Sequence, residues 1–127
     1  MAGDLKVVGK RVVRQDARAK AAGEYVYGMD FHVEGELHAT ILRSPHPYAR
    51  ILSIDTDTAR ALEGVEAILT AADLPAEMLM PGMVADQPPL ARGVVRDHGE
   101  PVALIAARTL EIAEEARDLI RVEYEPL

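Results

Sequence analysis

The amino-acid sequence predicts an α+β domain with a mixed β-sheet and two helices. Three observations support this fold class. Several segments of the 127-residue chain alternate apolar and polar residues with the period of a β-strand. Two other segments begin with a helix-capping residue and continue with apolar residues at helical spacing. Proline and glycine separate these segments and mark the turns between them.

The first part of the chain predicts an arm followed by two strands. Residues 1–24 are polar and weakly patterned, so we expect an arm that contains one short strand or none. Apolar and polar side chains alternate in residues 36–43, as in a half-buried strand. The Ser-Pro-His-Pro sequence at 44–47 must end this strand, because proline has no backbone N–H. A second strand is expected over residues 50–55.

A short helix and a third strand are predicted next. Thr56 or Asp57 can cap the helix, which we expect to run through Glu63. Gly64 follows where a helix commonly stops, because glycine enters the left-handed conformation without a Cβ clash. Residues 65–70 are predicted to form the third strand.

The second half of the chain predicts three strands and a helix. A strand is expected over residues 90–96. Residues 101–107 are apolar on both faces, which is typical of a fully covered strand. Thr109 can cap a helix that runs to about Asp118. The last strand alternates from Ile120 to the end of the chain.

A loop rich in proline and methionine, which we call the methionine loop, is predicted over residues 74–89. It contains four of the eight prolines and three of the five methionines, Met78, Met80 and Met83. Flexible thioethers suit adaptable apolar contacts, so these methionines are candidates for contact with a neighbouring domain. The sequence leaves open the alternative that they cover the core of this domain itself.

Composition limits the classes of function. The length favours a single domain over residues 1–127. The absence of cysteine excludes disulfides, thiolate catalysis and a cysteine-bound iron–sulfur cluster within this chain. A net charge of −7 disfavours nucleic-acid binding, and we interpret the basic stretch at Arg11, Arg14 and Arg18 as a solvated segment. No apolar run can cross a bilayer and no signal peptide is evident, so we expect no membrane contact and a cytoplasmic location.

The residue patterns predict no catalytic, cofactor-binding or metal-binding residue. Neither serine, Ser44 or Ser53, lies in a Gly-x-Ser-x-Gly sequence that would expose a nucleophile. The four histidines do not have the spacing of a zinc site on one helical face. Glu100 is the one carboxylate that stands out, because it lies between Gly99 and the apolar residues 101–107. It is a candidate contact to a neighbouring domain or ligand, and the alternative is a turn residue at the start of a strand.

Several motifs resemble a known family at matching order and spacing. They are Val8-Gly9-Lys10, Asp16-Ala17, Gly23-Glu24, Leu37-His38-Ala39, Leu42-Arg43-Ser44-Pro45-His46-Pro47-Tyr48-Ala49-Arg50-Ile51, Ser53-Ile54-Asp55-Thr56, Leu62-Glu63-Gly64-Val65, Leu69-Thr70-Ala71-Ala72-Asp73-Leu74-Pro75, Gly99-Glu100-Pro101-Val102-Ala103 and Val122-Glu123-Tyr124-Glu125-Pro126-Leu127. Together they cover nearly the whole chain. The chain resembles the first domain of the large, molybdenum-cofactor-binding subunits of xanthine dehydrogenase, aldehyde oxidase and aerobic carbon monoxide dehydrogenase.

The resemblance implies a fold, a holoenzyme and a role. The implied fold is the α/β-hammerhead, and the implied enzyme is a cytoplasmic hydroxylase with molybdopterin, whose iron–sulfur clusters and FAD are carried on partner domains. In that family the catalytic glutamate and the molybdopterin-binding segments lie in downstream domains, so we transfer no site residue to this chain. We therefore expect a scaffold domain that packs against downstream molybdenum-binding domains and is inactive alone. The alternative is a free-standing accessory protein with its own partner or ligand, and self-association is compatible with either role.

Overall fold

The computed structural model describes residues 6–127, and residues 1–5 of the predicted arm lie outside them. The chain divides into two compact units, residues 1–34 and residues 35–127. We call the described residues 6–34 the N-terminal unit and residues 35–127 the C-terminal unit. A single domain that spans the whole chain stays a prediction.

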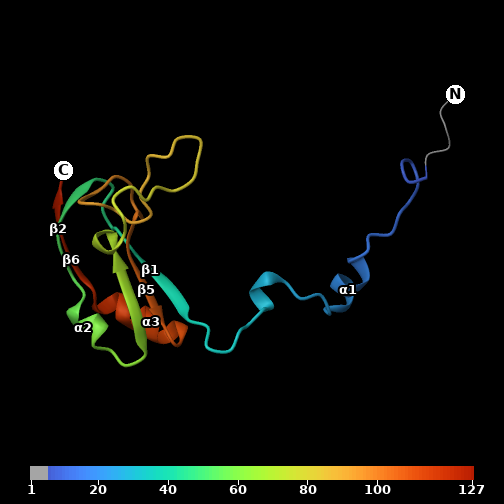
Figure 1. The fold of residues 1–127 in the computed structure, drawn as a ribbon, viewed down its shortest axis with the longest axis horizontal. Helices are drawn as coiled ribbons and strands as arrows, with labels where there is room; N and C mark the ends of the chain where they lie inside the picture. Colours follow the sequence, from blue (N-terminus) through green and yellow to red (C-terminus); the bar gives the residue numbers. More distant parts are fainter. Residues whose placement is uncertain (1–5) are drawn as a thin grey trace. The chain divides into compact units, whose positions relative to one another are not determined.

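The N-terminal unit contains two short helices and, within residues 6–34, no β-strand (Figure 1). Helix α1 spans Ala17–Ala22, and the 3₁₀-helix η1 spans Gly28–Asp30. Gly23 ends α1 in the left-handed conformation, with φ of 72°, and its N–H donates to the Lys20 carbonyl at 3.3 Å. No residue of this unit is buried, so it has no hydrophobic core of its own.

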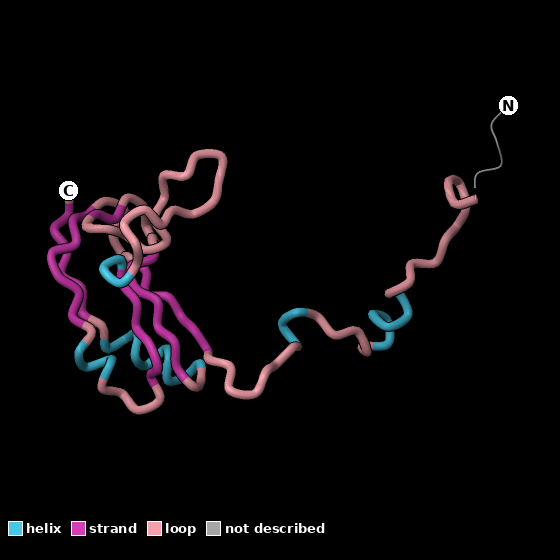
Figure 2. The backbone as a smooth tube through the Cα atoms, viewed as in Figure 1, coloured by secondary structure: helices cyan, strands magenta, loops and turns pink. Residues whose placement is uncertain are grey.

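The C-terminal unit contains the strands and helices that the sequence predicts, in the predicted order, and one 3₁₀-helix, η2, that was not predicted (Figures 1 and 2). They are β1 (His38–Arg43), β2 (Ala49–Asp55), α2 (Asp57–Arg60), β3 (Val65–Thr70), η2 (Ala71–Asp73), β4 (Val94–Val95), β5 (Pro101–Ala107), α3 (Leu110–Leu119) and β6 (Arg121–Pro126). The α+β class is thereby confirmed.

The strands form two three-stranded sheets, whereas we expected one mixed sheet. One sheet has the order β1-β5-β3 and the other has the order β4-β2-β6. Every strand pairing within residues 6–127 is antiparallel. The arrangement differs from the expected one because successive strands lie in alternate sheets. A helix such as α2 therefore connects two sheets, and it does not join parallel neighbours within one sheet.

The core lies on both faces of the central strand β5. Val102 packs with Ala49 and Val95 of the second sheet, whereas Ile105 and Ala107 pack in a cluster that includes α3. All of these side chains are fully buried. The prediction of a strand covered on both faces is confirmed, because one face of β5 packs in the cluster with α3 and the other packs against the second sheet.

Helix α3 packs against the β1-β5-β3 sheet through small side chains. Ala113 and Ala116 are buried, and the larger Ile112 and Leu119 pack at the edge of the same cluster. The Thr109 hydroxyl accepts a hydrogen bond from the Ile112 N–H at 3.3 Å, which confirms the predicted cap. The cap fixes where α3 begins, shortly after the end of β5.

Helix α2 ends at Arg60, earlier than the predicted end at Glu63. The Arg60 guanidinium donates to the Ile68 carbonyl at 2.7 Å, which ties the helix end to β3. Gly64 has the expected left-handed conformation, with φ of 91°. A Cβ atom at Gly64 would also lie 2.8 Å from Cδ1 of Ile112. This position therefore favours glycine because of its conformation and because of its packing.

Strand β4 covers only Val94–Val95, whereas we predicted a strand over residues 90–96. Gly93, with φ of 73°, turns the chain just before β4. The Ala91 N–H donates to the Pro101 carbonyl at 2.7 Å, outside any regular ladder. Ala91 is buried, but the turn at Gly93 prevents a continuous strand.

Candidate functional site

The end of β1 and the start of β5 are joined by reciprocal backbone hydrogen bonds. The Ser44 N–H donates to the Glu100 carbonyl at 2.9 Å, and the Gly99 N–H donates to the Ser44 carbonyl at 2.9 Å. The Arg43 guanidinium also donates to the Gly99 carbonyl at 2.9 Å. This junction holds the turn before β5 rigidly against the proline-rich turn that follows β1.

Glu100 is buried within this junction, with 7% of its surface exposed. Its carboxylate accepts a hydrogen bond from the Arg96 N–H, and its own N–H donates to the Asp97 carbonyl at 3.1 Å. The side chain therefore closes the turn at residues 96–100, as the turn interpretation requires. A contact between Glu100 and a neighbouring domain stays a prediction.

An open pocket of about 320 Å³ lies beside this turn. It is lined by Asp86, Gln87, Pro88, Arg96, Asp97 and Glu100. The pocket joins the end of the methionine loop to the turn before β5. Sequence reasoning did not bring these two segments together, because they are separated by the turn at Gly93 and strand β4.

Ser44 is a buried structural residue that sequence reasoning missed. Its hydroxyl accepts from the His46 N–H at 3.0 Å and donates to the His46 carbonyl at 3.1 Å. The His46 ring packs edge-on against Tyr124 of β6, with centroids 4.9 Å apart. Burial raises the pKa of the Tyr124 phenol. The signal in the sequence is a small hydroxyl residue immediately before a proline turn, a frequent side-chain-to-backbone motif.

The methionine loop contains no helix or strand, as predicted, and it projects from the C-terminal unit (yellow in Figure 1). Met78, Met80 and Met83 are 43%, 49% and 106% exposed. A large part of each of these side chains is therefore not packed on the core of this unit. Their predicted contact with a neighbouring domain is untested.

Specific hydrogen bonds hold the methionine loop in shape. At its base, the Arg92 guanidinium donates to the carbonyls of Leu74 and Pro75, both at 3.2 Å. Further out, the Met80 N–H donates to the Gln87 carbonyl at 2.8 Å and closes the tip into a narrow turn. The backbone that carries the exposed methionine side chains is thus held in a defined conformation.

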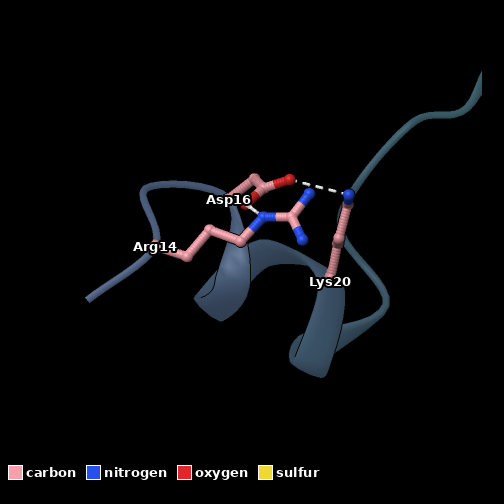
Figure 3. A network of polar contacts seen from close by, with 3 residues as sticks. All are labelled: Arg14, Asp16 and Lys20. Carbon is pink, nitrogen blue, oxygen red and sulfur yellow. Dashed lines mark ion pairs between the residues drawn. The ribbon is translucent and has the colours of Figure 1, made fainter. Parts of the chain in front are cut away.

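The N-terminal unit is organised by a small polar network (Figure 3). The Asp16 carboxylate lies 2.7 Å from Nζ of Lys20 and 2.6 Å from Nε of Arg14. The contact with Lys20, reinforced by Arg14, lowers the pKa of the Asp16 carboxyl. Nζ of Lys20 also lies over the ring of Tyr25, at 4.6 Å from its centroid, and 5.7 Å from the centroid of Tyr27.

The side chains described by the structure, those of residues 6–127, do not fit a molybdenum cofactor or an iron–sulfur cluster. Within residues 6–127, no group of three or more His, Cys, Asp or Glu could hold a metal ion. Every buried side-chain nitrogen or oxygen atom in the described residues has a hydrogen-bond partner. The sequence has no cysteine, which is the usual ligand of an iron–sulfur cluster.

The helices described between residues 6 and 127 are also too short or too polar for any of them to cross a membrane. The longest, α3, has ten residues, whereas a membrane-spanning helix needs about twenty.

Comparison with known proteins places the chain in a family. The family model described as "Aldehyde oxidase and xanthine dehydrogenase, a/b hammerhead domain" matches residues 22–127. The nicotinate dehydrogenase large molybdopterin subunit of Eubacterium barkeri is 37% identical over 127 residues, which are 100% of this chain and 30% of that protein. The carbon monoxide dehydrogenase large chain of Afipia carboxidovorans is 42% identical over 122 residues, which are 93% of this chain and 15% of that protein.

A solved structure gives the same result. Quinoline 2-oxidoreductase from Pseudomonas putida 86 matches with a TM-score of 0.84 and 41% sequence identity, over 94% of this chain and 16% of that chain. The chain thus spans between 15% and 30% of the length of these relatives. The family and fold that the sequence motifs led us to expect are confirmed, and this chain belongs to the α/β-hammerhead family of aldehyde oxidase and xanthine dehydrogenase.

Proposed function

We propose that this chain is a supporting domain of the large subunit of a molybdenum hydroxylase, and that the methionine loop packs against the domains that bind molybdopterin. The exposed methionines of that loop are the observation that carries the proposal. Contiguous exposed apolar side chains mark interaction sites in proteins, and thioethers adapt to an irregular partner surface.

The geometry of the loop supports a docking role. Arg92 anchors the base of the loop, and the bond from Met80 to Gln87 closes its tip. A loop that is held in shape before it binds loses less conformational entropy on binding. Met78, Met80 and Met83 can therefore contribute most of their apolar burial to the interaction.

In this proposal the chain contributes structure, and other domains contribute the chemistry. Molybdopterin supplies the redox reaction when it is bound to the domains that follow, and iron–sulfur clusters and FAD are carried on partner domains. Glu100 acts indirectly, by holding the turn that presents Arg96 and Asp97 beside the end of the loop. In this proposal the isolated chain is inactive, because other domains carry these groups.

Hydrogen exchange tests the docking of the loop. Amide exchange in residues 78–83 is measured in the 127-residue chain alone and in the assembled large subunit, with β5 as a segment that stays protected in both. We expect protection of the loop only in the assembled subunit. The substitution Met83→Asp should remove that protection, whereas Leu110→Asp, a matched change at the exposed start of α3, should not. Equal exchange of residues 78–83 in both samples would contradict the proposal.

A separate experiment tests the proposal that other domains, and not this chain, supply the redox chemistry. The purified 127-residue chain is analysed for molybdenum and assayed with an aldehyde, a purine and an aromatic heterocycle. We expect neither bound metal nor turnover. Stoichiometric molybdenum together with substrate oxidation would overturn the supporting role.

A further inference from the structure

The N-terminal unit carries many apolar side chains but buries none of them. Its ten large apolar residues are all exposed, from 39% at Tyr25 to 91% at Met29. They are Val7, Val8, Val12, Val13, Tyr25, Val26, Tyr27, Met29, Phe31 and Val33. A segment that remained permanently solvated would contain few such residues, because low apolar content is the signature of disordered chains. This composition indicates a segment that is covered by a partner.

The unit is ordered in a way that presents these side chains in two groups. The four valines precede α1, and the remaining large apolar residues follow it. Between the groups lies the polar network of Arg14, Asp16 and Lys20 (Figure 3). Nζ of Lys20 also lies over the ring of Tyr25. After it, the Tyr27 N–H donates to the Asp30 carboxylate at 2.9 Å and closes η1. Tyr25 takes part in these contacts through its ring, whereas the side chains of the four valines before α1 do not.

The first apolar group lies in a strongly basic segment. Residues 6–20 contain six basic residues and one acidic residue, Asp16, which gives a net charge of +5. The C-terminal unit contains eight basic and sixteen acidic residues, which gives −8. A surface that accepts residues 6–20 should therefore combine apolar sites for the valines with an acidic rim.

The comparisons indicate which protein supplies that surface. The C-terminal unit accounts for only 93 of the 127 residues. A structural match over 94% of the chain must therefore include most of the N-terminal unit, and the relative from Eubacterium barkeri matches over the full length of this chain. The segment is thus shared with proteins of which the matched part is a small fraction, and in those proteins a long remainder is available to cover it.

We propose that the N-terminal unit is a second docking element, separate from the methionine loop, and that it binds an acidic-rimmed apolar surface on the remainder of the same large subunit. This inference rests on the proposed function, because both assume the same partner. The two are distinguishable, because they involve different residues of the chain. The basic stretch that we interpreted from sequence as solvated becomes part of this contact.

Limited proteolysis with trypsin tests the inference, because the unit contains cleavable bonds at Lys6, Lys10, Arg11, Arg14, Arg18 and Lys20. Cleavage rates in this segment are compared between the 127-residue chain alone and the assembled large subunit. We expect cleavage to be at least about tenfold slower after assembly, since cleavage follows the population of the open form. Hydrogen exchange in residues 78–83 is followed in the same samples.

The double substitution Val12→Asp with Val13→Asp should return cleavage of the assembled subunit to about the rate of the 127-residue chain alone, an increase of at least about tenfold, because two valines lose an apolar site. Leu110→Asp is the matched control and should leave the rate unchanged. Because the N-terminal unit has no core, the substitutions should not unfold the C-terminal unit, and the thermal unfolding of the chain verifies this.

Each outcome distinguishes the alternatives. Slow cleavage after assembly, lost in the valine variant while the methionine loop stays protected, supports the second docking element. Rapid cleavage after assembly with a protected loop overturns this inference and leaves the proposed function standing. Rapid cleavage with an unprotected loop overturns both. Slow cleavage already in the chain alone means that the segment packs on this chain or on a second copy, and it overturns the inference.

Discussion

The two units of the chain use large apolar side chains in opposite ways. In the C-terminal unit, ten of the thirty Val, Leu, Ile, Met, Phe and Tyr residues are exposed, and five of these ten lie in the methionine loop. In the N-terminal unit all ten are exposed. Apolar content is therefore a poor guide to burial. What separates the units is strand pairing, which brings distant apolar segments together in one unit and is absent from residues 6–34 of the other.

The stabilising contacts differ in kind as well. The C-terminal unit depends on side chains that are excluded from water around β5. The N-terminal unit depends on exposed ion pairs and a cation–π contact, which each contribute little in water. The C-terminal unit should be sensitive to substitution where its side chains are buried, and the N-terminal unit should tolerate most changes until a partner covers it.

The largest expected effect comes from truncating the core. Ile105→Ala should lower the free energy of unfolding of the chain by about 2–5 kcal/mol, because it leaves a cavity beside α3. Val13→Ala, which also shortens an aliphatic side chain, should change it by less than about 0.5 kcal/mol, because Val13 is 79% exposed. Urea unfolding of the isolated chain measures both. Similar losses from the two variants would remove the distinction between the units.

A smaller effect is expected at the buried carboxylate. Glu100→Ala leaves the Arg96 N–H without its acceptor, so it should lower the free energy of unfolding by about 1–3 kcal/mol. Glu100→Gln keeps an acceptor oxygen at the same place and should recover much of that loss. Urea unfolding of the two variants side by side gives the answer. If both variants were as stable as the parent, Glu100 would have no role in the turn.

Two glycine substitutions in the C-terminal unit separate the cost of a packing clash from the cost of backbone strain. Gly64 and Gly99 have similar left-handed conformations, with φ of 91° and 88°. Alanine at either position should cost about 1–2 kcal/mol of backbone strain. Gly64→Ala should cost more than Gly99→Ala, because its Cβ would push Cδ1 of Ile112 aside, whereas nothing lies within 4 Å of a Cβ at Gly99. Thermal unfolding compares the pair, and a greater loss at Gly99 would contradict the packing argument.

The smallest expected effect concerns acid stability. Hydrogen bonds from the Thr70 N–H at 2.7 Å and the Thr70 hydroxyl at 2.9 Å lower the pKa of the Asp73 carboxyl. A lowered folded-state pKa means that this contribution to stability is complete above the unfolded-state pKa and is lost as pH falls through the folded-state pKa. Asp73→Asn should therefore flatten the acid side of the stability curve.

Asp16→Asn in the N-terminal unit is the control for Asp73→Asn. The pKa of Asp16 is also lowered, mainly by Lys20, but Asp16 lies in the unit without a core. Asp16→Asn should leave the unfolding curve of the chain unchanged at every pH. Carboxyl NMR titration gives both pKa values directly, and an ordinary pKa at Asp73 would disprove the hydrogen-bonding explanation.

Sequence reasoning located most elements of the C-terminal unit, because their signals are local. The alternation in β1 and β6 and the cap at Thr109 depend on residues that are close in the chain. The division into two sheets could not be predicted, since it depends on which strands pair across long separations. The end of α2 was missed because it is set by the Arg60 bond to Ile68 on another element.

The candidate site also has features that can be predicted from local sequence and features that cannot. The prolines of residues 74–89 predict a loop, and the methionines of that loop predict a candidate contact surface. Its exposure could not be inferred, because that depends on Arg92 anchoring it away from the core. The structural role of Ser44 depends on its bonds to His46 and on the junction with Glu100, which lies far away in the sequence.

The alternation of strands between sheets has a consequence for biosynthesis. The β1-β5-β3 sheet needs residues 38–107, and the other sheet needs residues 49–126, so no short stretch of chain contains either sheet. At about 5–20 residues per second, a nascent chain on the ribosome must wait several seconds between making β1 and making β6. During that interval the apolar strands have no partners, which exposes the emerging polypeptide to chaperones before this unit can fold.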